Sequence, residues 1–313
     1  MKKTYIYILI STILFSSMEI VLKTVAGLYN PIQLNLVRFF IGGIVLLPLA
    51  NYALKVTDHK LTVFDWLMFS LTGFLCVVVS MTLYQLAIVY DQPATVAVLF
   101  SSNPVFALLF AFLLLHEHLD RAEVISLIVT IIGLVVIVNP TNLVNPIGTS
   151  LGILSALTFG FYSIISRWAG LKSDLGGVAM TAYTFIAGSV ELLILVLLSH
   201  VKGISRWLNQ RSWGQSFANI PILKNVTPEH FLVLFVIGVC ITGGGFAFYF
   251  LAMEQGGVAL ASLVFFIKPA LAPILAMLSI HEHLTTSMIV GILILIVGSI
   301  ISFTDNQRQE KIA

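Results

Sequence analysis

The sequence predicts an all-α membrane protein whose ten transmembrane helices form two inverted repeats of five helices. Three observations lead to this fold class. Of the 313 residues, 58% are hydrophobic and only 10% are charged, too few charges to cover the surface of a soluble protein of this length. The hydrophobic residues gather in long blocks, and about 20 apolar residues form a helix that crosses roughly 30 Å of hydrocarbon. The third observation is an internal repeat.

The apolar blocks are joined mostly by short connections that contain turn residues, such as Asn30-Pro31. The first block resembles a secretory signal peptide, but it contains Glu19 and Lys23 and runs on through Val25, so we interpret it as a membrane helix. The long connection at about 200–230 mixes basic and aromatic residues, and we expect a short amphipathic helix at the membrane surface there. The approximate bounds of the ten blocks are 5–26, 31–51, 65–89, 94–115, 122–139, 150–170, 177–199, 231–253, 258–280 and 286–303.

The distribution of Lys and Arg predicts that both termini lie on the cytoplasmic side of the plasma membrane. In this orientation the connections between helices 1 and 2, 3 and 4, 5 and 6, and 9 and 10 face outward and contain no Lys or Arg. The segment 200–230 is an exception, because it contains four of them and faces outward too. The cytoplasmic segments contain Lys2, Lys3, Lys55, Lys60, Arg121, Lys172, Arg308 and Lys311.

The tetrapeptide HEHL occurs at 116–119 and again at 281–284, and this spacing of 165 residues reveals the repeat. At the same spacing Gly73 aligns with Gly238, Tyr84 with Tyr249, Pro104 with Pro269 and Gly133 with Gly298, without a gap from about 73 to 138. The chain therefore divides into halves 1–140 and 141–313. An odd number of spans in each half inserts the second half upside down, as in many secondary transporters.

The four histidines of the two HEHL motifs suggest a metal site, but the predicted geometry opposes it. The two motifs end helices at opposite faces of the membrane, roughly 30 Å apart. Within each motif the histidines are two positions apart and point in different directions on a helix, and neither motif is the H-E-x-x-H signature. We therefore interpret each motif as a helix end whose Glu favours the positive N-terminus of the next helix, and we predict no cofactor. Cys76 and Cys240 lie in apolar blocks, which argues against a disulfide or a zinc site.

The paired motifs resemble the drug/metabolite transporter superfamily, specifically its ten-helix members built from two EamA domains. The resemblance covers nearly the whole chain, and Arg38 resembles the arginine of the family's second helix, with Tyr183 at the matching position of the second half. It implies a plasma-membrane secondary transporter, often an exporter of amino acids, related metabolites or toxic compounds, and no enzyme activity. The motif residues are Tyr84, Pro104, Glu117, Leu119 and Gly133, and again Tyr249, Pro269, Glu282, Leu284 and Gly298.

Ionisable side chains within the predicted helices are candidate site residues, because each costs about 2.5–3.5 kcal/mol at the centre of a membrane helix. Lys268 lies near the middle of helix 9, directly before Pro269, and could bind a carboxylate or phosphate or take part in proton coupling. A structural salt bridge from Lys268 to Glu19 or Glu191 is the alternative. The counterpart of Lys268 in the first half is Asn103, which is polar but neutral.

Glu19 and Arg38 are predicted at similar depth in neighbouring helices, either as a structural ion pair or as a gating or proton-binding site. Glu19 also precedes Lys23 by four residues, the favourable order for a helical ion pair. Tyr84, Tyr162 and Tyr249 are phenols deep in predicted helices, where each either lines a cavity or packs in the core.

These residues favour a secondary transporter or exporter that moves small polar metabolites, in particular amino acids or organic anions, by alternating access. One alternative is proton-coupled efflux of lipophilic cations, in which Glu19 would dominate the site. A membrane-embedded enzyme is the other alternative, but the sequence shows no catalytic constellation for it. The predicted partners are a small-molecule substrate and membrane lipid, with proton coupling and the choice between monomer and homodimer left open. A net charge of +2 without a basic cluster argues against nucleic acid.

Overall fold

The computed structural model describes residues 2–116, 121–139, 145–211 and 214–312. This part of the chain is helical with no strand, and nine of its helices are long and apolar enough to cross a membrane. A tenth, shorter apolar helix spans Thr286–Ile301. The prediction of an all-α, ten-helix membrane protein is therefore confirmed.

The five spans of the first half are made of eight helical elements. They are α1 (Lys2–Thr24), α2 (Pro31–Val56), the continuous run of α3 (Val63–Gly73), π-helix η1 (Phe74–Ser80) and α4 (Met81–Tyr90), the run of α5 (Pro93–Phe100) and α6 (Asn103–Leu115), and α7 (Arg121–Val138).

The second half contains α8 (Pro146–Ser173), α9 (Gly177–Leu198) and the short α10 (Lys202–Asn209). After the 3-10 turns η2 (Gln215–Phe217) and η3 (Pro228–His230) come α11 (Phe231–Phe235), π-helix η4 (Val236–Gly244), α12 (Gly245–Ile280) and α13 (Thr286–Ile312). At Gly257, α12 turns sharply with a φ of 82°, a conformation that glycine adopts without steric cost. This corner joins two membrane spans directly.

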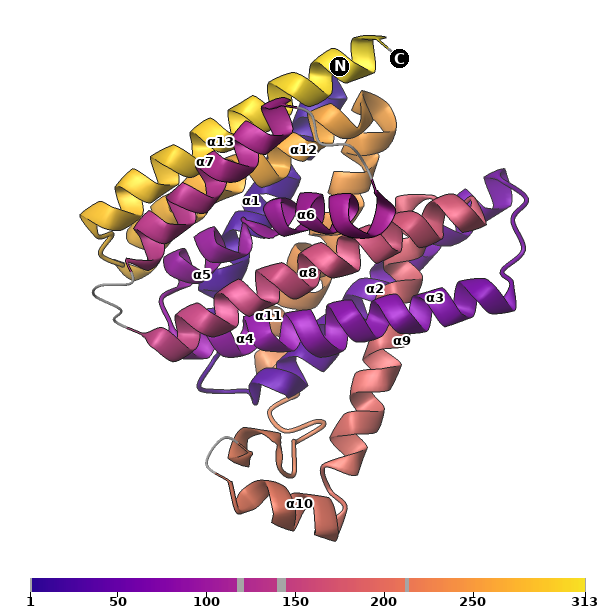
Figure 1. The fold of residues 1–313 in the computed structure, drawn as a ribbon. Coiled ribbons are helices and arrows are strands. Elements are labelled where there is room, and N and C mark those ends of the chain that lie inside the picture. The colour runs from indigo at the N-terminus through magenta and orange to yellow at the C-terminus, as the bar shows by residue number, and fades with distance from the viewer. Residues whose placement is uncertain (1, 117–120, 140–144, 212–213, 313) are drawn as a thin grey trace.

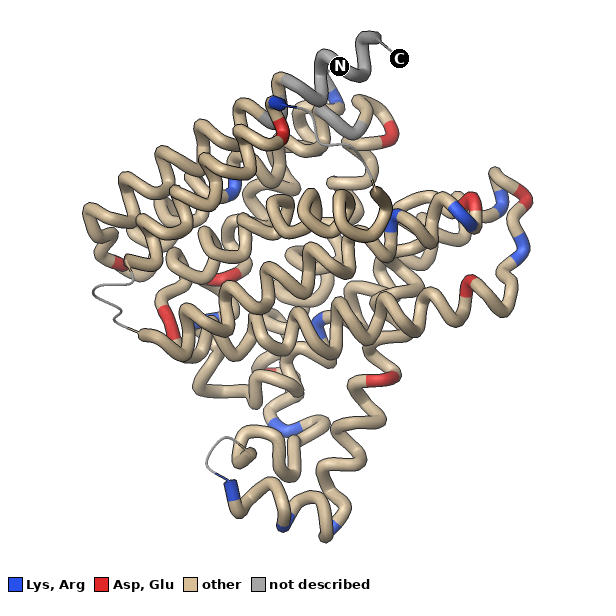
Figure 2. Tube along the Cα trace, viewed as in Figure 1, with Lys and Arg blue, Asp and Glu red and all other residues tan. Residues whose placement is uncertain are grey.

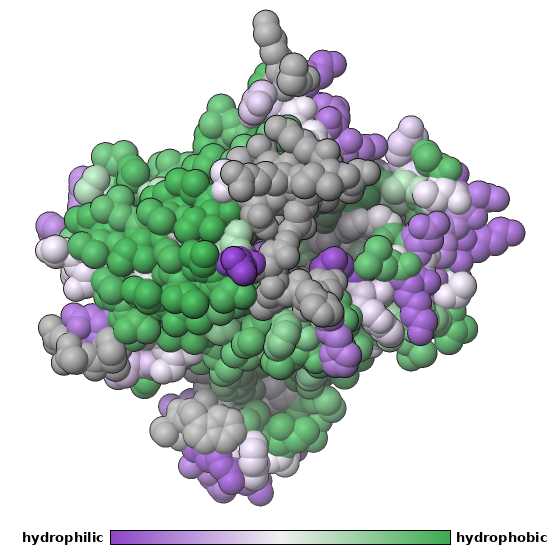
Figure 3. All heavy atoms as spheres, turned by 45° about the horizontal axis from the view of Figure 1, so that its top comes forward, coloured by the Kyte–Doolittle hydropathy of each residue, from purple (hydrophilic) through white to green (hydrophobic). Residues whose placement is uncertain are grey.

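The helices run back and forth, so their ends gather at two ends of the bundle (Figure 1). We call them the terminal end, which carries both chain termini and the connection 57–62, and the α10 end, which carries the connection 25–30 and α10. Charged residues lie mainly at these ends and on α10 (Figure 2), whereas a broad apolar surface covers the side of the bundle seen in Figure 3. This distribution is typical of a protein that crosses a membrane.

Both HEHL motifs begin with a histidine that ends a helix. His116 and His281 each adopt left-handed backbone geometry with a φ of 54°, and their N–H groups donate to the carbonyls of Ala111 and Ala276. This arrangement is a helix C-cap, so the interpretation of the motifs as helix ends is confirmed for the two histidines. Residues 117–120, which include Glu117 and Leu119 of the first motif, lie outside the described residues. Among the described residues, no group of three His, Cys, Asp or Glu is placed to hold a metal ion.

Two charged side chains contact helix ends other than those expected. The Glu282 carboxylate accepts the Ala94 N–H at 3.3 Å, at the first turn of α5 rather than of α13. The Lys23 ammonium donates to the carbonyls of Ile88 and Asp91 at 2.7 Å each, where α4 ends, and not to Glu19 as the spacing of four residues predicted. Both choices follow from the unpaired amides and carbonyls at helix ends, which attract opposite charges.

Glu282 is expected to give the stability a pH dependence. Burial raises the pKa of Glu282 above its ordinary value, although the Ala94 amide and Lys23 oppose this shift. A raised carboxyl pKa contributes stability at acidic pH that is lost as the pH rises through the raised value. We expect thermal unfolding to show this loss in the wild type but not in Glu282→Gln. Glu282→Ala should cost about 0.5–2 kcal/mol, because it removes the carboxylate that accepts the Ala94 N–H at the first turn of α5. Identical pH profiles for wild type and Glu282→Gln would contradict the assignment.

Helices α3 and α9 cross at a pair of glycines, and larger residues should separate them there. A Cβ atom added at Gly73 would lie 2.5 Å from the backbone nitrogen of Gly188 and 2.9 Å from the Thr184 carbonyl oxygen. We expect Gly73→Ala to destabilise the protein by about 1–3 kcal/mol through overpacking. Gly27→Ala is the matched control, because no atom lies within 4 Å of its added Cβ. Equal melting temperatures of the two variants would disprove this close contact.

Hydrogen bonds hold residues 222–225 of the long connection against the turn between α1 and α2. Gln33, which is fully buried, donates to the carbonyls of Lys224 at 2.7 Å and Ile222 at 3.2 Å. The Asn225 side chain donates to the Leu28 carbonyl at 2.5 Å. The amphipathic helix expected in this segment is present as α10, on which Ile204 and Trp207 are exposed and Leu208 is buried. Its placement at the membrane surface stays a prediction.

Candidate functional site

A small closed cavity of about 40 Å³ lies where helices from both halves of the chain meet. Among the described residues that line it, the charged ones are Arg38 of α2 and Lys268 of α12. Most of the remaining lining is apolar, with the thioethers of Met18 and Met81. The aromatic rings of the lining belong to Phe15, Phe39, Phe100, Phe159, Tyr162, Phe185, Phe246 and Phe265.

Arg38 is held in place by a chain of hydrogen bonds that begins at a π-helix. The side-chain nitrogen of Asn35 donates to the Val77 carbonyl of η1 at 2.8 Å. Asn35 Oδ1 in turn accepts from Nε and Nη2 of Arg38, both at 3.2 Å. Asn35 and Arg38 share one face of α2 because they are three residues apart. The irregular turn of η1 thus positions the guanidinium, consistent with the frequent occurrence of π-bulges at functional sites.

The faces of two aromatic rings surround the Arg38 guanidinium, which is 1% exposed. Its central carbon lies 4.4 Å from the centre of the Phe39 ring and 5.9 Å from that of Tyr84. Its Nη1 and Nη2 atoms also contact the sulfur atoms of Met18 and Met81 at 3.4 and 3.5 Å. All of these partners are uncharged, so they stabilise the cation only weakly.

Beside the cavity, Glu19 forms a buried cluster with Lys268 and Tyr84. The Lys268 ammonium lies 2.8 Å from Glu19 Oε1, and the Tyr84 hydroxyl donates to the same oxygen at 2.5 Å. Both partners therefore share Oε1, while Oε2 has no hydrogen-bond partner among the described residues. The three side chains are at most 4% exposed. The cluster links α1, α4 and α12.

The structure thus shows the ion pair that the sequence left open for Lys268. Glu19 is its partner, whereas Glu191 accepts a hydrogen bond from Ser70 at 2.5 Å between α9 and α3. Glu19 does not pair directly with Arg38, whose polar partner is Asn35. Lys268 lies 5.4 Å from the centre of the Phe100 ring, so the second cation of the cavity also rests against an aromatic face.

The other predicted site residues divide between the cavity and its surroundings. Tyr162 lines the cavity, next to the thiol of Cys76. Tyr249 lies behind the wall, with its ring 5.1 Å from that of Phe265. Asn103 donates to the Phe100 carbonyl at 2.8 Å, where the span expected at 94–115 is interrupted between α5 and α6. This interruption precedes Pro104, whose ring cannot continue a regular helix.

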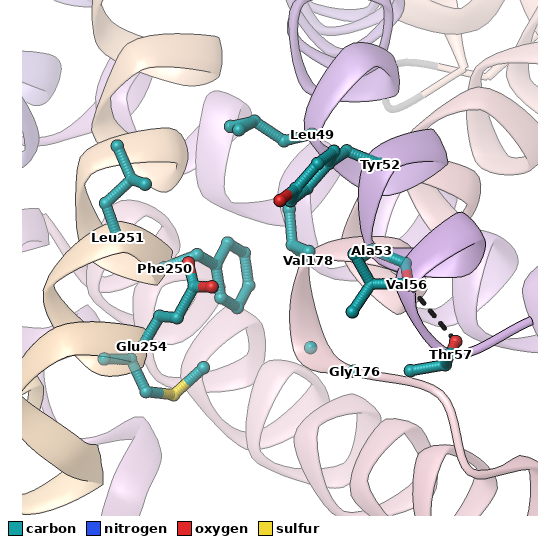
Figure 4. A pocket seen from close by; sticks show the side chains of 12 residues that line it. Leu49, Tyr52, Ala53, Val56, Thr57, Gly176, Val178, Phe250, Leu251 and Glu254 are labelled. Carbon is teal, nitrogen blue, oxygen red and sulfur yellow. Dashed lines mark hydrogen bonds between the residues drawn. The ribbon is translucent and has the colours of Figure 1, made fainter.

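A second, larger pocket of about 330 Å³ opens at the terminal end of the bundle, between α2, α9 and α12. The Tyr52 hydroxyl and the Phe250 ring face this pocket from opposite sides (Figure 4). Glu254, which is exposed, is its charged residue among those described. Phe250 stacks on Phe246 with ring centres 6.4 Å apart, and Phe246 lines the closed cavity. One stacked pair of rings thus reaches from the wall of the pocket to the wall of the cavity.

Sequence reasoning missed most of the cavity wall. The phenylalanines and methionines that form it lie in apolar helices where such residues are common, so their types carry no signal. Asn35 could have been found, because it is a polar residue three positions from Arg38 on the same helical face. Phe246 and Phe250 give no signal of their own.

Ten apolar helices around a cavity that holds two buried cations define a multi-pass membrane protein, and comparison with known proteins identifies its family as one of transporters. The model of the EamA-like transporter family matches residues 2–139 and 146–304. The chain belongs to this family, as the resemblance of its motifs predicted.

Similar proteins are named as transporters too. An uncharacterized transporter of Clostridium kluyveri is 34% identical over 318 residues, covering 98% of this chain and 95% of that protein. A protein of Rickettsia felis named S-adenosylmethionine uptake transporter is 27% identical over 196 residues, covering 61% of this chain and 64% of its own. A solved crystal structure with 16% identity matches with a TM-score of 0.62 over 96% of both chains, which shows the shared fold.

Proposed function

We propose that the protein is a secondary transporter that carries small metabolites with a carboxylate group, amino acids or organic anions, by alternating access around the central cavity. The observation that carries this proposal is the pair of cations, Arg38 and Lys268, on the wall of a cavity otherwise lined largely by apolar residues. Buried cations in a membrane are costly and mark substrate or ion pathways. A guanidinium and an ammonium together are well suited to bind a carboxylate.

Alternating access is supported by the difference between the two ends of the bundle. The pocket at Tyr52 and Phe250 opens at the terminal end, while the segment 199–230 is fastened over the α10 end by Gln33 and Asn225. The stacked rings of Phe246 and Phe250 lie between the pocket and the cavity. We interpret this state as one that faces the terminal end with its gate closed.

We further propose that residues 1–140 and 141–313 are two inverted copies of one EamA unit. Support comes from the two separate matches of the family model and from the paired helix caps at His116 and His281. The π-helices η1 and η4 also occupy corresponding places in the two halves. In many secondary transporters, one inverted half moves against the other, so that the central site opens first to one face of the membrane and then to the other.

The Lys and Arg pattern supports a plasma-membrane orientation with both termini in the cytoplasm. In that orientation the pocket faces the cytoplasm, and cargo would reach the cavity from inside the cell in this state. The Glu19 carboxylate, with its free Oε2 beside the cavity, is the group we propose for any proton coupling.

Two other cargoes remain as alternatives. The name of the Rickettsia felis relative suggests S-adenosylmethionine, whose amino-acid end also carries a carboxylate. Proton-coupled efflux of lipophilic cations requires an available carboxylate in the cavity. Glu19 is instead bound to Lys268 and Tyr84, which favours carboxylate cargo over cations.

Flux measurements in proteoliposomes test the proposal. Uptake and efflux of amino acids, organic acids, S-adenosylmethionine and a lipophilic cation would be compared with protein-free liposomes, with and without a pH gradient. We expect at least one carboxylate compound to move faster with protein than without it. If only lipophilic cations are accelerated, the cationic alternative is correct. If no carboxylate compound is accelerated, the proposed cargo class is wrong.

A further inference from the structure

We infer that the cavity selects cargo with a net charge of minus one and discriminates against zwitterions. This inference rests on the proposed function and narrows it, because it separates organic acids from amino acids, two classes that the sequence leaves together. The inference has two grounds. Some of the charges around the cavity already have a partner of opposite charge, and some of the aromatic faces already contact a cation of the protein.

The first step concerns Glu19, whose carboxylate directly contacts Lys268 of the cavity wall. Its Oε1 atom is shared by the Lys268 ammonium at 2.8 Å and the Tyr84 hydroxyl at 2.5 Å. Glu19 and Lys268 therefore form a neutral pair, and the carboxylate lies behind Lys268 rather than in the cavity lining. Its Oε1 atom is therefore occupied, and an ammonium group that approached the remaining Oε2 atom would be repelled by the neighbouring Lys268 ammonium.

The second step concerns Arg38, which has no anion in direct contact: Glu19 acts on it through space, but Glu19 is already paired with Lys268. In the described part of the chain, its hydrogen-bond acceptors are Asn35 Oδ1 and the sulfur atoms of Met18 and Met81, all of them uncharged. A buried cation without an anion is strongly destabilising in a medium of low dielectric constant. With Glu19 and Lys268 paired, the empty site has a net charge of plus one, and one cargo carboxylate completes it.

The third step excludes the aromatic rings as a second site for an ammonium. Rings can bind ammonium groups through their faces, but the resident cations already use several of them. Arg38 lies over Phe39 and Tyr84, and Lys268 lies over Phe100. An ammonium placed nearby would be repelled by both cations. For a zwitterion, the repulsion of its ammonium group would therefore cancel much of the binding free energy that its carboxylate contributes.

Asn35 offers a variant that tests this charge count with little change in shape. Asn35→Asp places a carboxylate where Asn35 Oδ1 now accepts from Arg38 at 3.2 Å. Arg38 would then be paired and the empty site would be neutral. Arg38→Gln also makes the site neutral, by removing the cation instead of adding an anion. It keeps the hydrogen bond from Asn35 to the Val77 carbonyl, which Asn35→Asp would lose.

The test uses compounds that share a skeleton and differ in charge. One set is 3-phenylpropanoate, phenylalanine and 2-phenylethylamine, and an aliphatic set is 4-methylpentanoate, leucine and 3-methylbutylamine. Binding to the purified protein is measured by thermal stabilisation, and transport by flux in proteoliposomes. In each set we expect the acid to bind at least about tenfold more tightly than the amino acid, as the worth of one charge-assisted hydrogen bond implies. The amine should bind weakest, and S-adenosylmethionine, with two positive groups, should also bind weakly.

The outcomes separate this inference from the proposed function. If an amino acid binds as tightly as its matched acid, the inference is overturned while carboxylate transport stands. If neither acids nor amino acids bind or move, the proposed function is overturned together with it. In Asn35→Asp and in Arg38→Gln, the preference for acid over amino acid should fall by about tenfold. An unchanged preference in both variants would show that Arg38 does not set the selectivity.

Discussion

Lys268→Met is expected to abolish transport and to lower the free energy of unfolding by about 3–5 kcal/mol, the cost of leaving one partner of a buried ion pair alone. The reason is Glu19, which is 1% exposed and lies 2.8 Å from the lysine ammonium. Without Lys268, the Tyr84 hydroxyl is the hydrogen-bond partner that Glu19 keeps among the described residues. Lys60→Met is the matched control, because Lys60 is exposed and the change should leave stability and flux near wild type.

The double variant Lys268→Met with Glu19→Gln separates a structural ion pair from a binding site. Replacing both charges removes the unpaired carboxylate, so most of the lost stability should return. Transport should stay absent, because the cavity has lost one of the two cations, Arg38 and Lys268, that we propose bind the cargo carboxylate together. Stability is measured by thermal unfolding in detergent and transport by flux in proteoliposomes. A double variant that regains both would show that the pair only holds α1 and α12 together.

The sequence was sufficient for the fold because a membrane imposes strict lengths and periodicity on each span. The blocks of apolar residues correspond to the observed helices, and the HEHL motifs correctly indicated where two of them end. It was less informative inside the spans. The π-helices η1 and η4 and the break between α5 and α6 depend on which side chains meet the backbone in space. Asn35 at the Val77 carbonyl is one example, joining positions 42 residues apart.

The candidate site was predicted only where a residue type is unusual in a membrane. Glu19, Arg38 and Lys268 stood out because charged residues rarely occur in apolar helices. Their partners could not be assigned from sequence, since helical spacing joined Glu19 to Lys23 whereas the structure joins it to Lys268 and Tyr84. The phenylalanine wall had no signal at all, because the same residue type also covers the lipid-facing surface.

The repeat that we propose would also account for the asymmetry of the cavity. Lys268 corresponds to Asn103 and Arg38 to Tyr183, so each cation has a neutral counterpart in the other half. The Asn103 side chain donates to the Phe100 carbonyl at the break between α5 and α6, while Lys268 lies within the part of α12 that follows the corner at Gly257. Tyr183 donates to Asn51 at 2.8 Å, in a partly exposed position. We interpret the duplicated scaffold as the moving part and the unmatched cations as the part that recognises cargo.

Phe246→Ala is expected to open the cavity toward the terminal end, because Phe246 contributes to its wall and stacks on Phe250 of the neighbouring pocket. An aromatic pair contributes about 0.5–1.5 kcal/mol beyond its buried area, so its loss should raise the open fraction by up to about tenfold. Cys76 reports this opening directly, since its thiol is 1% exposed and lines the cavity. Cys240, the one other cysteine in the sequence, is removed as Cys240→Ser.

In that background, N-ethylmaleimide should label Cys76 faster in Phe246→Ala than with Phe246 present, and bound cargo acid should slow the labelling again. Phe112→Ala is the matched control, because Phe112 is 49% exposed on α6 and does not line the cavity. In Phe246→Ala, cargo should also enter and leave the cavity faster from the terminal end of the bundle than in the wild type. If both variants label Cys76 at the same rate, the rings of Phe246 and Phe250 do not close the path to the cavity. The pocket at Tyr52 would then be separate from the transport route.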